Sequence, residues 1–185
     1  MQAERRNHDQ SLLFFYHLHM EIDCKFISAN CNPVYHALTY LKGTSTVAYC
    51  AANQVLLHDT SRLNTTGSLN MNRKCDCYAA EDPGRCNCLT SYQSATHGYI
   101  VAGYESGDIA VFECPKDQYQ DHTKWRLASR TKQNASIIFI ELLEHQNNVL
   151  LATINNKASC SIIQVLKDIS LKEAFCMNFP LSKIP

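Results

Sequence analysis

Short runs of apolar residues, each bounded by turn-forming residues, alternate along most of the chain. The clearest example is the segment 99–113, in which residues 99–103 and 109–112 are apolar and residues 105–108 read Glu-Ser-Gly-Asp. Gly107 can adopt the positive φ that a tight turn between two strands requires. The pattern therefore predicts a β-hairpin with strands at 99–103 and 109–114.

The same pattern predicts strands over most of the remaining sequence, separated by short polar turns. They lie at 24–31, 34–41, 46–51, 54–58, 67–71, 85–92, 125–129, 135–143, 148–154, 159–166 and 173–179. Residues 72–84 read as a connecting loop that ends in Asp-Pro-Gly. Many short strands at even spacing are typical of all-β folds.

Parts of this pattern repeat along the chain. Residues 47–59 align without a gap with residues 101–113, and residues 151–153 align with residues 101–103. Units of four short strands repeated every ~40–50 residues are typical of WD-type β-propellers, in which each sheet buries its faces against its neighbours. We therefore predict an all-β, WD40-like β-propeller that is incomplete, with about three four-stranded blades.

The repeat also suggests a domain organisation. We expect residues 1–23 to form a poorly ordered N-terminal extension and residues 24–185 to form the partial propeller. The blades are expected at 34–71, 85–130 and 135–179, with residues 24–31 as an extra strand. Propellers contain about four to eight blades. Three blades cannot close a ring. We expect the chain to be a fragment of a longer protein; the alternatives are an incomplete gene model and open edges that meet a partner.

Composition limits the possible partners and location. Hydrophobic residues make up 45% of the chain and charged residues 18%, which argues against bulk disorder. Lysine plus arginine equals aspartate plus glutamate, so the basic excess of general nucleic-acid binding is lacking, and we predict no direct nucleic-acid partner. The apolar segment 11–20 is too short to span a bilayer and lacks a signal-peptide cleavage site. We expect a cytoplasmic or nuclear protein without a membrane partner.

The ten cysteines raise the question of a metal site. Cys75, Cys77, Cys86 and Cys88 form two C-x-C pairs, whereas structural zinc sites usually use C-x2–4-C pairs. Side chains two residues apart on a strand lie roughly 6.5–7 Å apart, which is too wide for chelation. Buried thiols are therefore the favoured interpretation, and zinc is the minor alternative. We find no catalytic or phosphate-binding motif, and we predict no cofactor and no enzymatic activity.

A family resemblance begins near the N-terminus. Residues 26–33 read Phe-Ile-Ser-Ala-Asn-Cys-Asn-Pro, and they precede a His-Ala pair, a Thr-Val-Ala-Tyr-Cys strand and an Asn-Gln-Val-Leu-Leu-His-Asp strand. This series resembles the opening blade of the Elongator complex protein 2 family. Residues 85–89 resemble the start of the family's first WD repeat. Pro33 and Tyr40 depart from the arginine and tryptophan common there. The matching motif residues are Ile27, Ser28, Cys31, Asn32, His36 and Ala37.

The resemblance implies a non-catalytic scaffold function. Members of this family belong to Elongator, which modifies wobble uridines in tRNA, and they hold its large scaffold subunit and its catalytic acetyltransferase subunit together. Those two subunits are the partners that the resemblance implies. Two alternatives stay open: a WD-repeat adaptor outside Elongator, and a small zinc-binding protein organised by the C-x-C pairs.

Overall fold

The computed structural model describes residues 31–34, 36–62, 64–69, 82–145, 148–165 and 171–178. All of them belong to the second of two units, Cys31–Pro185. The predicted extension at 1–23 lies outside the described residues, as does the strand expected at 24–31 except for its last residue. No helix in the described part of the chain is long and apolar enough to cross a membrane.

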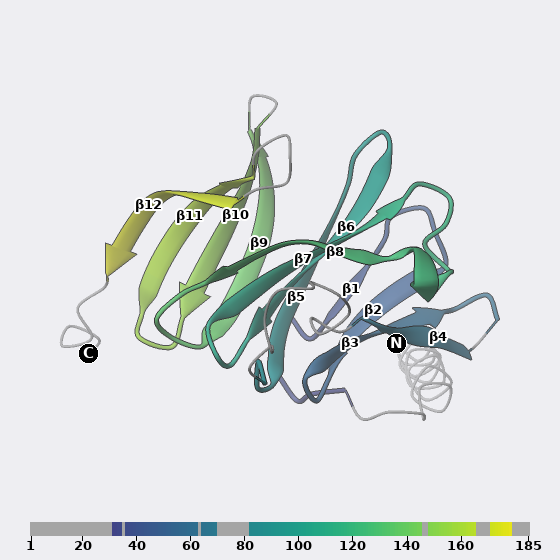
Figure 1. Ribbon diagram of the computed structural model, residues 1–185, viewed down its shortest axis with the longest axis horizontal. Coiled ribbons are helices and arrows are strands. Elements are labelled where there is room, and N and C mark those ends of the chain that lie inside the picture. Colours follow the sequence, from purple (N-terminus) through teal and green to yellow (C-terminus); the bar gives the residue numbers. More distant parts are fainter. Residues whose placement is uncertain are drawn as a thin grey trace, which may run out of the picture. The chain divides into compact units, whose positions relative to one another are not determined.

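The described residues form an all-β fold of three four-stranded antiparallel sheets (Figure 1). In each sheet the strands lie side by side in their order along the chain. Within the described ranges, one 3-10 turn, η1 (His122–Lys124), precedes β8. Sheet A contains β1 (Leu38–Tyr40), β2 (Thr46–Ala51), β3 (Gln54–Asp59) and β4 (Asn64–Leu69); sheet B contains β5 (Cys86–Gln93), β6 (His97–Tyr104), β7 (Asp108–Pro115) and β8 (Arg126–Lys132); sheet C contains β9 (Ile137–His145), β10 (Asn148–Asn155), β11 (Ser159–Val165) and β12 (Leu171–Asn178).

Most predicted strands are present, and two differ clearly in extent. The strand predicted at 34–41 is reduced to β1, because His36 takes a φ of 59° and interrupts the extended backbone. The outer strand predicted at 67–71 lies earlier, at β4. The central hairpin is confirmed: β6 and β7 pair antiparallel, and Gly107 in their turn has a φ of 88°.

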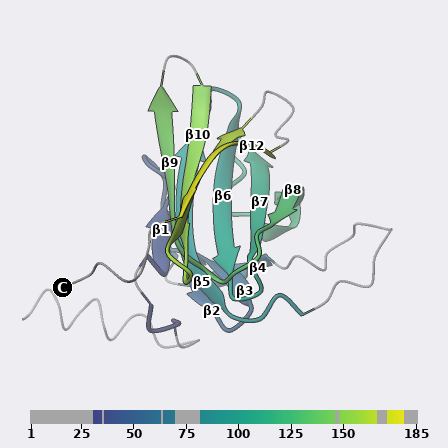
Figure 2. The ribbon, with the colours of Figure 1, turned by 90° about the vertical axis from the view of Figure 1, so that its left-hand side faces the viewer.

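Sheet B is buried on both faces, and its neighbours supply the two cores. One core joins sheet A to sheet B and includes Cys50, Leu57, Ile100, Tyr104 and Phe112. The other core joins sheet B to sheet C and includes Val101, Ile109, Val111, Ile140 and Leu151. The axes of the long strands in sheets B and C are roughly aligned, with arrows that point both ways (Figure 2). Because β7 faces a core on each side, every residue from Asp108 to Cys114 is buried.

The side chains that enter each core show that the predicted alignment of β2 with β6 is shifted by one residue. Ala48 faces the following sheet, whereas its predicted counterpart Ala102 faces the preceding one. The structural counterpart of Ala48 is Val101, one residue earlier. The reason is the longer turn between β6 and β7, since a slip of one residue moves a side chain to the other face of a strand.

The same comparison changes the register of the third unit. Leu151 faces sheet B, and its counterpart is Ile100, which faces sheet A. The predicted pairing of Leu151 with Val101 was therefore wrong by one residue. In the corrected register, position 87 of sheet B corresponds to position 138 of sheet C.

Candidate functional site

The described motif residues near the start of sheet A form the seam between sheets A and B. The amide nitrogen of Asn32 donates to the carbonyl oxygens of Ala52 at 2.9 Å and Cys86 at 2.8 Å. Its amide oxygen accepts from the backbone N–H of Ala52 at 2.9 Å. One side chain therefore ties the β2–β3 turn to the first residue of β5.

His36 and Ala37 extend this seam. The carbonyl oxygen of His36 accepts a 2.7 Å hydrogen bond from the N–H of Leu89 in sheet B. The His36 ring also packs edge-on against Phe139 of sheet C, with ring centroids 4.9 Å apart. Ala37 is buried, and its carbonyl oxygen accepts from the N–H of Cys50. Cys31 is exposed, and the predicted motif residues Ile27 and Ser28 lie outside the described residues.

The asparagine link recurs at the next seam. Asn87 donates through its amide nitrogen to the carbonyl oxygen of Ile137 and to the hydroxyl of Ser136, both at 3.0 Å. It thus joins the start of β5 to the start of β9, as Asn32 joins sheet A to β5. The corresponding position in sheet C is Ile138, which cannot donate such a bond and is 47% exposed.

The structure places only two of the four C-x-C cysteines. Cys75 and Cys77 lie outside the described residues. Cys86 and Cys88 are fully buried, but Cys86 belongs to the core between sheets A and B and Cys88 to the core between sheets B and C. A β-bulge between Cys86 and Cys88 interrupts the alternation of side chains, so the two side chains do not share a face as residues two apart on a regular strand would. These two thiols therefore point to opposite faces of one sheet and do not converge on a common ion.

The chemistry of these thiols follows from their burial. Cys86 Sγ lies 3.1 Å from Cys50 Sγ, with both side chains enclosed. Burial, followed by the contact with Cys50, raises the pKa of Cys86 well above its usual range. Burial raises the pKa of Cys88 to about 12. Both thiols are protonated at neutral pH, which makes them poor nucleophiles. Within the described part of the chain, no three histidine, cysteine or acidic side chains are grouped to hold a metal ion.

Three carboxylates are paired with arginines at the ends of the strands. Asp108 accepts hydrogen bonds from Arg130 Nε at 2.9 Å and from Ser106 Oγ at 2.5 Å. Burial alone would raise the pKa of Asp108, but these two bonds outweigh it, and the pKa is lowered. The other pairs are Arg126–Glu113 and Arg62–Asp59. These ion pairs fix turns and strand ends.

A different cluster lies at the rim between sheets B and C. Tyr92 on β5 is the cross-strand partner of Tyr99 on β6, and the two rings stack with centroids 6.1 Å apart and planes at 20°. The His97 ring lies against Tyr99 at 6.2 Å. All three side chains are partly exposed. We refer to Tyr92, Tyr99 and His97 as the aromatic rim.

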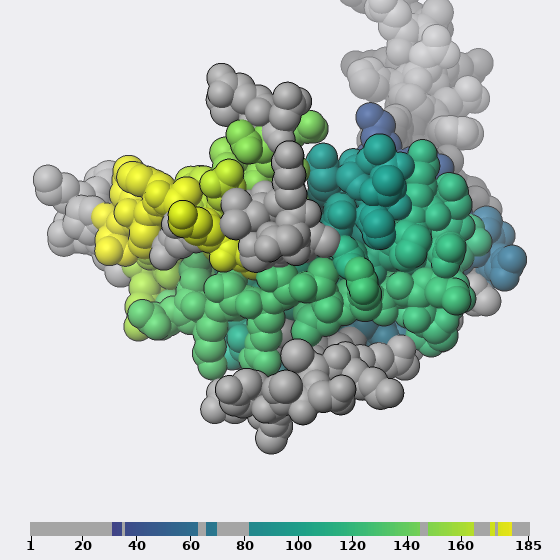
Figure 3. Space-filling view, turned by 45° about the horizontal axis from the view of Figure 1, so that its top comes forward, coloured from purple at the N-terminus to yellow at the C-terminus, as the bar shows by residue number. Residues whose placement is uncertain are grey.

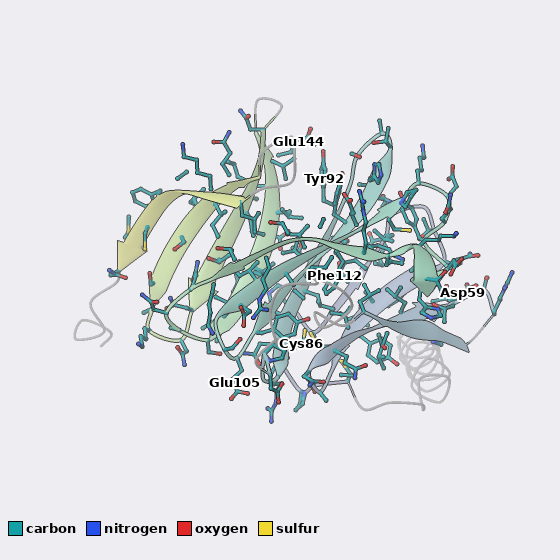
Figure 4. All side chains as sticks on the ribbon, in the orientation of Figure 1. Asp59, Cys86, Tyr92, Glu105, Phe112 and Glu144 are labelled. Atoms are coloured by element: carbon teal, nitrogen blue, oxygen red, sulfur yellow. The ribbon has the colours of Figure 1, made fainter. Side chains whose placement is uncertain are left out.

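Glu144 at the end of β9 completes this rim. Ile140, Leu142 and Glu144 are spaced two residues apart on β9, so their side chains lie on the same face of the strand. Ile140 and Leu142 pack into the core between sheets B and C, and Glu144 therefore points toward sheet B as well. Figure 4 places Tyr92 and Glu144 near one another at the ends of their strands. Burial, then the negative charge of Glu144, raises the pKa of Tyr92. Glu144 is exposed, and no described cationic side chain forms an ion pair with it.

This aromatic rim was not among the sites predicted from the sequence. Tyr92 and Tyr99 flank a short polar turn at symmetrical positions, so their pairing could have been inferred from the predicted hairpin. The contribution of Glu144 could not, because it depends on how sheet C packs against sheet B.

Comparison with solved structures identifies the fold. Sqt1 from Saccharomyces cerevisiae is similar with a TM-score of 0.57 and 14% identity, over 83% of this chain and 39% of that one. The Cps50 (Swd1) β-propeller domain from Myceliophteria thermophila gives 0.52 and 11%, over 82% and 39%. The WD40 domain of SCAP from fission yeast gives 0.51 and 9%, over 82% and 33%.

The fold is that of a WD40 β-propeller over part of its length. The predicted fold class is thereby confirmed, and the chain spans less than two-fifths of each of the three structures compared. No family model and no curated protein matches the sequence. The match to solved structures does not distinguish Elongator complex protein 2 from other propeller proteins.

Proposed function

We propose that this chain is a non-catalytic protein-interaction scaffold. The main support is that sheet B buries both faces against its neighbours, so its solvent-facing parts are turns and rim side chains on a rigid frame. Such rims are where folds of this type present binding residues. The buried, protonated thiols and the arginine-paired carboxylates offer no evident catalytic group.

Stable complex formation by the full chain tests this proposal. The chain is tagged, cross-linked in the cells that express it and purified, and the complexes are separated by size. We expect at least one protein to co-elute in a fixed ratio after high-salt washing. A chain that elutes alone under all conditions, or one that turns over a substrate, would contradict the scaffold function.

Within this function, we propose the Elongator scaffold as the finer assignment. Its support is the N-terminal resemblance, together with the position of Asn32, His36 and Ala37 at the seam between sheets A and B. The expected partners are the large scaffold subunit and the acetyltransferase subunit, in the cytoplasm or the nucleus. Purified complexes that lack the large scaffold subunit would end this assignment and leave a WD-repeat adaptor outside Elongator.

The zinc-binding alternative has a direct test of its own. Metal analysis of the purified chain is compared with that of Cys86→Ser and of Cys176→Ser, an exposed cysteine that serves as the control. Stoichiometric zinc that disappears only with Cys86→Ser would support the metal site. The opposite directions of Cys86 and Cys88 favour the outcome without zinc.

A further inference from the structure

We propose that the aromatic rim and Glu144 form a binding site for a cationic side chain, arginine or lysine, of a protein partner. This inference rests on the scaffold function proposed above and names the chemistry by which the scaffold would recognise a partner. It concerns residues from two different sheets that the fold brings to one edge.

The aromatic part of the site supplies a surface that attracts cations. A ring presents negative electrostatic potential on its face, and a guanidinium or ammonium group is attracted within about 6 Å of the ring centroid. Tyr92 and Tyr99 are nearly parallel and partly exposed. Their cross-strand pairing on adjacent strands holds them in this arrangement before any ligand arrives, which reduces the entropy lost on binding.

The charged part of the site supplies a carboxylate that forms no ion pair with any described cationic side chain. Glu113 lies opposite Tyr99 across the β6–β7 pair, but it already has a cation, because Arg126 binds its Oε1 atom. Glu144 has no such partner among the described cationic side chains. An incoming cation would therefore find one carboxylate available beside the rings, and a phosphate group would be repelled by it.

The position of the site suits a partner chain. The β5–β6 hairpin, in teal, and the end of β9, in light green, both reach the surface in the space-filling view (Figure 3). The aliphatic part of a lysine or arginine can lie along Leu142 and Tyr99, which are only partly buried at the same rim.

The test is a titration of the full chain carrying carbon-13-labelled tyrosine, followed by NMR. The probes are the capped tripeptides Gly-Arg-Gly, Gly-Lys-Gly and Gly-Gln-Gly, together with inorganic phosphate. We expect saturable shifts of the Tyr92 and Tyr99 ring signals with the arginine or the lysine peptide. The glutamine peptide and phosphate should cause none.

Variants assign the binding to the named residues. Tyr92→Leu should weaken binding about three- to tenfold, whereas Tyr92→Phe, which keeps the ring, should stay within about twofold. Glu144→Gln should weaken binding about twofold to fivefold. The matched controls are Tyr40→Leu, an exposed tyrosine of sheet A, and Glu141→Gln, which precedes Leu142 on β9 and faces away from sheet B. Both should bind as the original chain does.

Several results would overturn the site. They are equal shifts with the glutamine peptide, shifts with phosphate alone, no saturable shift with either cationic peptide, and unchanged binding by Tyr92→Leu. The outcome is separable from that of the scaffold function. Partners that co-purify equally with a Tyr92→Leu, Glu144→Gln double variant would leave the scaffold standing and refute the site. A chain that binds the cationic peptides but retains no protein would refute the scaffold instead.

Discussion

The side-chain amide of Asn32 donates a 2.8 Å hydrogen bond to the carbonyl oxygen of Cys86, 54 residues further along the chain. With its two bonds to Ala52, this side chain joins a turn of sheet A to the first strand of sheet B. A single polar residue thus links two sheets whose main contact is apolar.

Replacing Asn32 should weaken this seam. We expect Asn32→Ala to lower the free energy of unfolding by about 1–2 kcal/mol, because it leaves the partly buried carbonyl oxygen of Cys86 without its partner and removes two exposed bonds to Ala52. Urea denaturation followed by the fluorescence of Trp125, the only tryptophan and a buried one, measures the change. The matched control is Asn53→Ala, whose one side-chain bond is exposed and 3.3 Å long. Equal midpoints for the two variants would contradict a special role of Asn32.

Substituting Gly43 and Gly107 by alanine distinguishes the cost of backbone strain from the cost of steric overlap. Gly43 and Gly107 both have positive φ, at 73° and 88°, and a Cβ at Gly43 would meet nothing within 4 Å. A Cβ at Gly107 would lie 2.2 Å from the carbonyl oxygen of Gln133. We expect Gly43→Ala to cost about 1 kcal/mol and Gly107→Ala at least about 2–3 kcal/mol. Thermal denaturation gives both values, and a difference near zero would show that the β6–β7 turn moves to relieve the overlap.

The Asp108–Arg130 pair should contribute to acid sensitivity. The pKa of Asp108 is lowered in the folded chain, so the ionised carboxylate stabilises the fold above its usual pKa of 3.8. That stabilisation is lost as pH falls from about 4 through the lowered pKa. Arg130→Met should remove about 1–3 kcal/mol at pH 7 and flatten the loss of stability below pH 4.

Arg62→Met is the matched control for this ion pair. Arg62 is 73% exposed and lies 3.6 Å from Asp59, so it should contribute no more than about 0.5 kcal/mol. Urea denaturation at a series of pH values gives the comparison. An Arg130→Met variant with the original pH dependence would show that Ser106 and Lys132 maintain the low pKa of Asp108 without Arg130.

Cysteine labelling should follow burial. With a pKa of about 12, roughly one Cys88 side chain in ten thousand is a thiolate at pH 8. We expect iodoacetamide to modify the exposed Cys31 and Cys176 in the folded chain and to leave Cys50, Cys86 and Cys88 unmodified until urea unfolds it. Peptide mass spectrometry after timed labelling measures this order. Early modification of Cys88 would indicate that the core between sheets B and C opens readily.

The sequence predicted the positions of the strands better than the faces that their residues occupy in the repeat. Gly107 stands between two apolar runs, and that local signal is enough to place the hairpin. The register of the repeat was misplaced because both Val101 and Ala102 are apolar and buried, so hydrophobicity alone does not tell which face each one occupies. In a strand buried on both sides, the alternation that fixes a register is missing.

Contacts between residues far apart in the sequence could not be predicted from the local pattern of apolar and polar residues. Asn32 stood out through a resemblance, but its bond to Cys86 depends on how two sheets stack. The aromatic rim was missed for the same reason, since Glu144 comes near Tyr92 only after sheet C packs on sheet B. The separation of Cys86 from Cys88 depends on a bulge that the C-x-C spacing does not reveal.

Sheet C is linked by an asparagine on one side, through Asn87 of sheet B, and we expect it to open before sheet B does. Sheet B is tied on both sides by Asn32 and Asn87, whereas the outer face of sheet C carries exposed Ile138, Leu143, Phe175 and Met177. Amide hydrogens of β12 should therefore exchange with solvent before those of β10, and those of β6 and β7 should exchange last. The rate at which sheet C separates, rather than the strength of the central sheet, would set how long the aromatic rim and Glu144 stay together.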